Sequence, residues 1–182
     1  MTSVREVDLL AERAHAGQVD KIGRPYIEHV RAVAAGLAPL GDELVMAGLL
    51  HDVVEDTDWT AEKLLAAGVP TRVVEIVEAV TNQAGMAYEE KIQRITADPE
   101  ATLVKISDNA HNSHPGRAAQ LPADKRERLA AKYRAARAAL WPAAGRADIE
   151  SIVRIVNPSL LAELDEHRPT TLAPPDVGSA SR

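Results

Sequence analysis

Residues 43–58 read ELVMAGLLHDVVEDTD, and this stretch decides the fold. Its first half is almost wholly apolar, and residues 51–56 then carry four ionisable side chains. On one continuous helix, His51 lies one turn from Glu55 and Asp52 lies one turn from Asp56, because side chains four residues apart share a face. The two pairs lie side by side, about 100° apart around the axis. The stretch therefore predicts a buried helix that ends in a crowded charged patch.

Helical patterns continue through the rest of the chain. Aliphatic residues recur with a period near 3.6, and no convincing strand alternation occurs. Capping residues and prolines mark helix starts, for example Thr60 and Pro99. The expected helices cover about residues 4–14, 25–37, 43–54, 61–67, 70–80, 88–97, 99–112 and 122–140, with one or two more between 145 and 166. These patterns predict an all-α fold.

Composition excludes several classes of function. The 182 residues carry a formal net charge of −6, which argues against binding to a nucleic-acid polymer or an anionic membrane. Without cysteine, the chain cannot form disulfides, zinc–thiolate sites or a thiol nucleophile. No segment reads as a signal peptide or a membrane span, so a soluble, cytoplasmic protein is expected.

The charged patch at residues 51–56 favours a cation. Its crowded carboxylates repel one another, and a divalent ion would relieve that repulsion, although most acidic helix ends are simply solvated. Two further candidates lie in apolar helical contexts, His29 in PYIEHVRAV and Asp108 in ATLVKISDNAHN. A lone histidine there is often a hydrogen-bonded core residue, whereas a buried aspartate needs a cation or donors. Taken together they predict one metal site, for which Mn²⁺, Fe²⁺ or Zn²⁺ suits the donors better than Ca²⁺.

With these residues in these positions, the chain resembles the HD-domain phosphohydrolases, in particular the hydrolase domain of the RelA/SpoT-type alarmone enzymes and the small stand-alone alarmone hydrolases. The matching segments cover about residues 5–140 and follow the family order AERAHAGQVDKIGRPYIEH, GLLHDVVEDTD, LVKISDNAHN and DKRERL. The resemblance implies an HD-domain helical bundle over residues 1–142, followed by a helical extension over residues 143–167. Residues 168–182 have the composition of a disordered tail.

The resemblance also implies residue roles. One divalent ion, most simply Mn²⁺, would be held by His29, His51, Asp52 and Asp108. The attacking water would be handled by Glu55 and Asp56. Phosphate and ribose contacts would come from Lys21, Asn112 and Arg128. Flanking residues receive structural roles: His111 and His114 at the surface or behind the ligands, Lys105 in an ion pair, and Tyr26 in helix packing.

The expected partner is a small phosphorylated nucleotide. The activity that the resemblance implies is hydrolysis of ppGpp to GDP and pyrophosphate by a metal-activated water. Only about 40 residues follow Leu140, too few for a synthetase domain, so hydrolysis alone is expected.

Three questions stay open from the sequence. Asp20 occupies the position where alarmone hydrolases usually carry an arginine that stacks on guanine, so the enzyme could be a phosphatase or pyrophosphatase for ppApp, NADPH or another nucleotide. A non-catalytic nucleotide sensor is a second alternative, although the intact pair Glu55 and Asp56 favours catalysis. A homo-oligomer is compatible with the sequence.

Overall fold

The structure, a computed structural model, describes residues 2–167, and the predicted disordered tail lies outside these residues. Within them the chain is helical and forms no β-strand, so the all-α prediction is confirmed. The helices are α1 (Val4–Ala14), α2 (Tyr26–Leu37), α3 (Asp42–Leu50), α4 (Val53–Asp56), α5 (Ala61–Ala66), α6 (Thr71–Val80), α7 (Tyr88–Ile95), α8 (Pro99–Asn112), α9 (Pro115–Ala118), α10 (Ala123–Leu140), α11 (Arg146–Val156) and α12 (Leu161–Glu166). None of these helices is both long enough and apolar enough to cross a bilayer.

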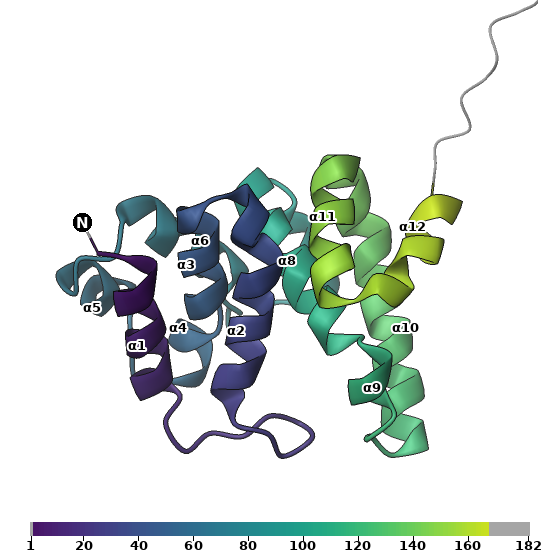
Figure 1. The fold of residues 1–182 in the computed structure, drawn as a ribbon, viewed down its shortest axis with the longest axis horizontal. Coiled ribbons are helices and arrows are strands. Elements are labelled where there is room, and N and C mark those ends of the chain that lie inside the picture. Colours follow the sequence, from purple (N-terminus) through teal and green to yellow (C-terminus); the bar gives the residue numbers. More distant parts are fainter. Residues whose placement is uncertain (1, 168–182) are drawn as a thin grey trace, which may run out of the picture.

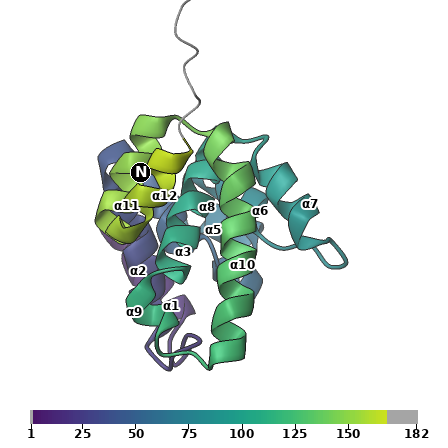
Figure 2. The same ribbon diagram turned by 90° about the vertical axis from the view of Figure 1, so that its right-hand side faces the viewer.

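Helices α2, α3 and α8 form the centre of the bundle (Figure 1). Helices α1 and α6 pack on α3, whereas α10 and α11 pack on α8. Figure 2 shows α10 running along one side, with α7 beside it. The core is almost entirely aliphatic, and its largest fully buried apolar side chains are Leu37, Leu50, Leu64, Ile76, Ile95, Ile106, Leu140, Ile149 and Ile152.

Local capping explains several helix starts. Ser3 and Glu6 form a reciprocal capping box at α1. Thr60 and Asp98 accept backbone N–H groups at the starts of α5 and α8. Each such cap satisfies an N–H group that a helix start would otherwise leave without a partner.

The predicted continuous helix over residues 43–54 is wrong. Helix α3 ends at Leu50, and the short helix α4 begins at Val53. Between them, the His51 ring shares a hydrogen bond of 2.8 Å with the carbonyl of Gly48, and Asp52 lies at φ −107° and ψ −2°. This turn separates α3 from α4 and leaves the side chains of residues 51 and 52 beside His29 and Asp108.

The C-terminal helices belong to the same core. Helix α11 packs directly on α2 and α8, and Ile149, Ile152 and Val153 are buried there. Gly36 makes room for the Val156 side chain of α11, because an added Cβ would clash with a Val156 methyl carbon. Residues 143–167 therefore cover the back of the bundle.

Candidate metal centre and the surrounding cavity

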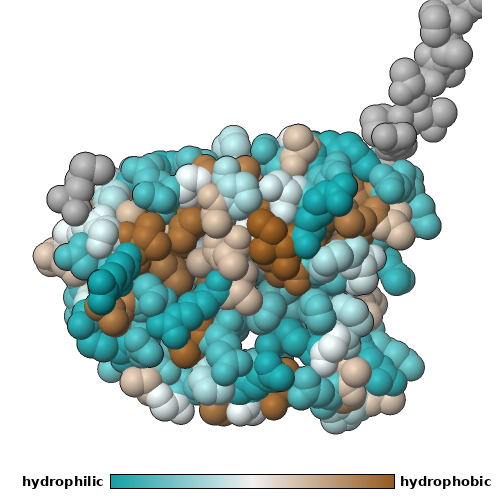
Figure 3. Space-filling view, in the orientation of Figure 1, coloured by the Kyte–Doolittle hydropathy of each residue, from teal (hydrophilic) through white to brown (hydrophobic). Residues whose placement is uncertain are grey.

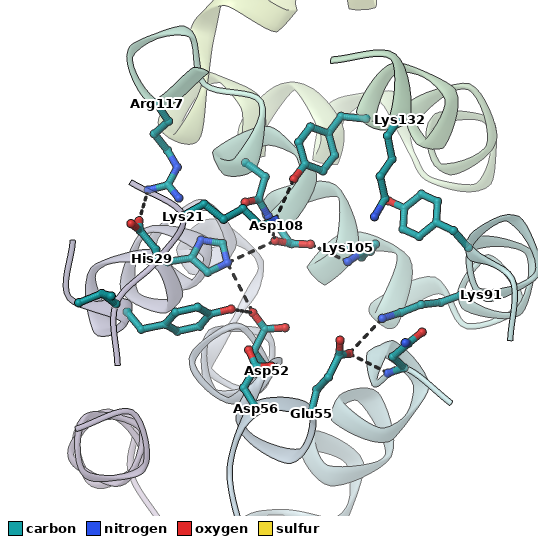
Figure 4. Close-up of a pocket in the computed structure, with 17 residues that line it drawn as sticks. Lys21, His29, Asp52, Glu55, Asp56, Lys91, Lys105, Asp108, Arg117 and Lys132 are labelled. Carbon is teal, nitrogen blue, oxygen red and sulfur yellow. Dashed lines mark hydrogen bonds and ion pairs between the residues drawn. The ribbon is translucent and has the colours of Figure 1, made fainter. Parts of the chain in front are cut away.

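Three helices bring potential metal ligands to one point. His29 of α2, His51 after α3 and Asp108 of α8 each offer one ligand atom, and these atoms all lie within 4.8 Å of one another. All three residues are buried. Asp52 joins them, because its Oδ2 lies 2.9 Å from His51 Nε2 and 3.6 Å from His29 Nε2 (Figure 4).

The His51 ring is oriented for ligation. Its Nδ1 is engaged by the Gly48 carbonyl at 2.8 Å, which requires a hydrogen on Nδ1 and leaves the Nε2 lone pair facing the cluster. Within residues 2–167, Nε2 is buried and has no hydrogen-bond partner, although Asp52 Oδ2 lies 2.9 Å away. A buried nitrogen beside carboxylate oxygens, held by a backbone bond on its other side, fits a divalent cation.

His29 is supported from behind by His111. The two Nδ1 atoms lie 2.7 Å apart. Burial tends to lower the pKa of His29, but hydrogen bonds with Asp108 and Asp52 outweigh it and raise the pKa to about 9. Burial and the neighbouring His29 lower the pKa of His111 to about 3. His29 Nδ1 therefore donates to a neutral His111, so that its Nε2 faces the carboxylates.

Both aspartates of the cluster stay ionised. Burial tends to raise the pKa of Asp52, but contacts with His51 and His29 hold the pKa well below its usual range. Burial has the same tendency at Asp108, where the Lys105 ammonium 2.6 Å away lowers the pKa. An ionised carboxylate is the form that binds a metal.

Hydroxyl and amide groups fix the two carboxylates. Tyr26 packs against the core as expected, and its hydroxyl also donates to Asp52 Oδ2 at 2.7 Å. Asn112, one turn after Asp108, donates its side-chain amide to Asp108 Oδ1. Lys105 forms the ion pair that the sequence left open.

A cavity of about 390 Å³ opens above this cluster. Its walls come from the α1–α2 loop and from α2, α4, α7, α8, α9 and α10. Figure 3 shows a hydrophobic band across the face formed by α1, α2 and α11, and a hollow below that band. The residues that line the cavity are Val19, Asp20, Lys21, Tyr26, His29, Asp52, Glu55, Asp56, Asn82, Tyr88, Lys91, Lys105, Asp108, Asn112, Arg117, Lys132 and Tyr133.

The acidic pair of α4 lies on the cavity wall. Glu55 Oε2 accepts hydrogen bonds from the Asn82 N–H at 2.8 Å and from Lys91 at 3.2 Å. Burial and the charge of Asp52 raise the pKa of Asp56. The two carboxyl groups therefore differ in environment, one held by donors and the other shifted toward its protonated form.

The three predicted substrate contacts fall in different places. Lys21 and Asn112 line the cavity, and Lys21 Nζ lies 3.4 Å from the hydroxyl of Tyr133. Arg128 is exposed and is not among the lining residues, so its role stays a prediction. Lys132, one turn further along α10, lines the cavity instead.

The sequence did not predict three other cations of the cavity. Lys91 and Lys132 lie on helices with many charged residues, and no local pattern separates these two or Arg117 from solvated side chains. Arg117 belongs to α9, a four-residue helix whose start is capped by His114 and which was not predicted. Only the tertiary fold brings these three to the cavity.

Comparison with known proteins now identifies the family. Residues 9–140 match the family model described as the HD domain. The chain belongs to the HD domain family. An HD domain implies a divalent metal, and the cluster of His29, His51 and Asp108 offers that metal a site.

Named relatives share this HD domain sequence. The chain is 38% identical over 135 residues to the guanosine-3′,5′-bis(diphosphate) 3′-pyrophosphohydrolase of Haemophilus influenzae. The aligned region covers 67% of this chain and 20% of that relative. It is 36% identical over 143 residues to the bifunctional (p)ppGpp synthase/hydrolase SpoT of Escherichia coli. Here the aligned region covers 70% of this chain and 20% of that relative. The chain thus spans about a fifth of the length of these relatives.

A solved structure shares the fold of this HD domain. It is described as a metazoan ortholog of SpoT that hydrolyzes ppGpp and plays a role in starvation responses. The match has a TM-score of 0.68 and covers 85% of this chain and 95% of that chain, at 24% sequence identity. At this identity the match confirms the predicted HD-domain bundle and carries no argument about activity.

Proposed function

We propose that this HD domain is a metal-dependent (p)ppGpp 3′-pyrophosphohydrolase, which converts ppGpp to GDP and pyrophosphate. The observation that carries the proposal is one cavity with a buried His29–His51–Asp108 cluster at its base and lysines on its walls. Sequence relatives that are named for this reaction support the choice of substrate. The proposal places the protein in the cytoplasm with its nucleotide substrate.

The metal site in this proposal comprises His29, His51, Asp52 and Asp108. Two imidazoles with two carboxylates suit a first-row divalent ion, and we propose Mn²⁺, with Fe²⁺ or Zn²⁺ as substitutes. When bound, such a cation lowers the pKa of water and stabilises negative charge on phosphoryl oxygens. All the residues of the proposed site fall within the hydrolase region over residues 1–142.

The acidic pair of α4 positions water in this proposal. Glu55 is held through Oε2 by Asn82 and Lys91, and its Oε1 has no hydrogen bond within the described residues. Oε1 is therefore free to orient a water and accept its proton. Asp56, whose pKa is raised, is suited to hold the proton afterwards. The water oxygen bonds to phosphorus as the bond to the ribose 3′ oxygen breaks, and that oxygen takes up a proton.

Two cavity ammonium groups are suited to the pyrophosphate. Lys105 and Lys91 are already paired with Asp108 and Glu55. Within residues 2–167, Lys21 and Lys132 form no ion pair: Lys21 is near the Tyr133 hydroxyl, and Lys132 lies 3.9 Å from the centre of the Tyr88 ring. We assign both to phosphate binding, together with the amide of Asn112.

A substrate panel tests the proposed function. Metal-loaded protein is incubated separately with ppGpp, pppGpp, ppApp and NADPH, and the products are separated by anion-exchange chromatography. We expect ppGpp to yield GDP and pyrophosphate in equal amounts. Orthophosphate from ppGpp, or turnover of NADPH alone, would replace the proposal with a phosphatase for another nucleotide. Binding without turnover of any compound would support a sensor instead.

A further inference from the structure

The loop between α1 and α2 is built around a buried carboxylate. The Asp20 side chain is 4% exposed, and its Oδ1 accepts the N–H groups of Ile22 at 2.9 Å and Arg24 at 3.0 Å. Its Oδ2 accepts from Arg117 Nη1 at 2.8 Å, across 97 positions of sequence. One aspartate thus fixes both its own loop and a guanidinium from α9.

Arg117 is a cavity cation whose charge is already balanced. Its remaining N–H groups form no hydrogen bond within residues 2–167, although the side chain lines the cavity. Pairing with Asp20 reduces its attraction for a further anion, whereas Lys21 and Lys132 carry no such partner. A neutralised guanidinium still offers a flat face and a fork of donors, which suit an uncharged ring with acceptor atoms.

An apolar side chain accompanies Arg117 at this end of the cavity. Val19, next to Asp20, is 61% exposed and is the only aliphatic residue in the described cavity lining. Figure 4 shows Arg117 on the opposite side of Asp108 from Lys91 and Lys132. Lys91 and Lys132 therefore lie at one end of the cavity, whereas the charge-balanced Arg117 lies at the other end, near Lys21 and exposed apolar surface.

We propose that Arg117 contacts the nucleobase of the substrate, that Val19 packs against the same base, and that Asp20 is the positioning residue for Arg117. The inference rests on the proposed function, because it takes the occupant to be a nucleotide. Arginine pairs with the O6 and N7 acceptors of guanine through two donors, whereas adenine has a donor at the 6-position. The arrangement therefore favours a guanine base.

Binding of two product fragments tests this assignment without requiring turnover. Calorimetry measures the affinity of metal-loaded protein for GDP, which carries the base, and for inorganic pyrophosphate, which does not. We expect Arg117→Ala to weaken GDP binding about 10- to 30-fold and pyrophosphate binding less than about 3-fold. Arg117→Lys restores the charge but not the planar fork, so the GDP loss should persist.

Two further variants test the same base contact if Arg117→Ala folds poorly. Val19→Ser changes an exposed position and should weaken GDP binding about 3-fold while sparing pyrophosphate. Asp20→Asn keeps an acceptor for the loop but frees the charge of Arg117, so pyrophosphate should bind about 2- to 5-fold more tightly. The control is Arg31→Ala, which removes an arginine–aspartate pair between α1 and α2, outside the cavity.

The outcomes separate this inference from the proposed function. Equal losses for GDP and pyrophosphate in Arg117→Ala, or rescue of GDP binding by Arg117→Lys, would show that Arg117 acts as a phosphate cation and would overturn the inference while ppGpp turnover stands. Selective GDP losses in a wild-type protein that hydrolyses none of the panel would support the base contact and overturn the proposed function.

Discussion

Replacing His51 by alanine is expected to remove the metal and the activity together. The His51 Nε2 atom faces Asp52 and Asp108 and has no hydrogen-bond partner within residues 2–167, so the substitution removes a ligand and, among hydrogen bonds of the ring, only the one to the Gly48 carbonyl. We expect metal affinity to fall at least ~100-fold and ppGpp turnover at least ~1000-fold. Elemental analysis of the purified variant and a pyrophosphate-release assay measure the two losses.

The matched control is His15→Ala. His15 is equally buried, its Nδ1 is hydrogen-bonded to Gln18, and its Nε2 also has no partner among the described residues, but it does not line the cavity. This variant should keep the metal content of the wild-type protein. A His51→Ala variant that retained full metal content would remove His51 from the ligand set.

Replacing Glu55 by glutamine is expected to abolish turnover but spare the metal. Glutamine keeps an acceptor for the Asn82 N–H but cannot take a proton from water. Loss of a positioned general base costs typically about 100- to 10 000-fold in rate. We expect a fall of that size in kcat for ppGpp, with metal content unchanged by elemental analysis.

The control for this second prediction is Glu75→Gln on α6. Glu75 pairs with Arg72 at the surface and lies outside the cavity, so kcat should change less than about 2-fold. Full activity in Glu55→Gln would move the water-handling role to Asp56. Loss of metal in Glu55→Gln would instead make Glu55 a ligand.

Local signals explain how much of the fold could be predicted. Thr60 and Asp98 cap their helices through hydrogen bonds within three residues, and such contacts are visible in the sequence. The end of α3 after Leu50 could not be predicted from the sequence. There the Gly48 carbonyl bonds to the His51 ring, and Asp52 is held by the hydroxyl of Tyr26, which lies 26 residues earlier.

The same distinction applies to the site. His29 and Asp108 stood out as polar residues in apolar helical runs, and the structure brings both to His51. Arg117 did not stand out, because its position depends on Asp20, 97 residues earlier. Lysines and arginines on polar helices are solvated in most proteins, so their choice of partner appears only with the tertiary structure.

The most direct test of the central claim is a metal titration of the wild-type protein. Protein stripped with chelator is assayed for pyrophosphate release from ppGpp while Mn²⁺ is added in substoichiometric steps. We expect no release before addition, then a linear rise that breaks at one ion per chain, in step with bound metal. Full activity in the stripped protein, or no activity with one ion bound, would contradict it.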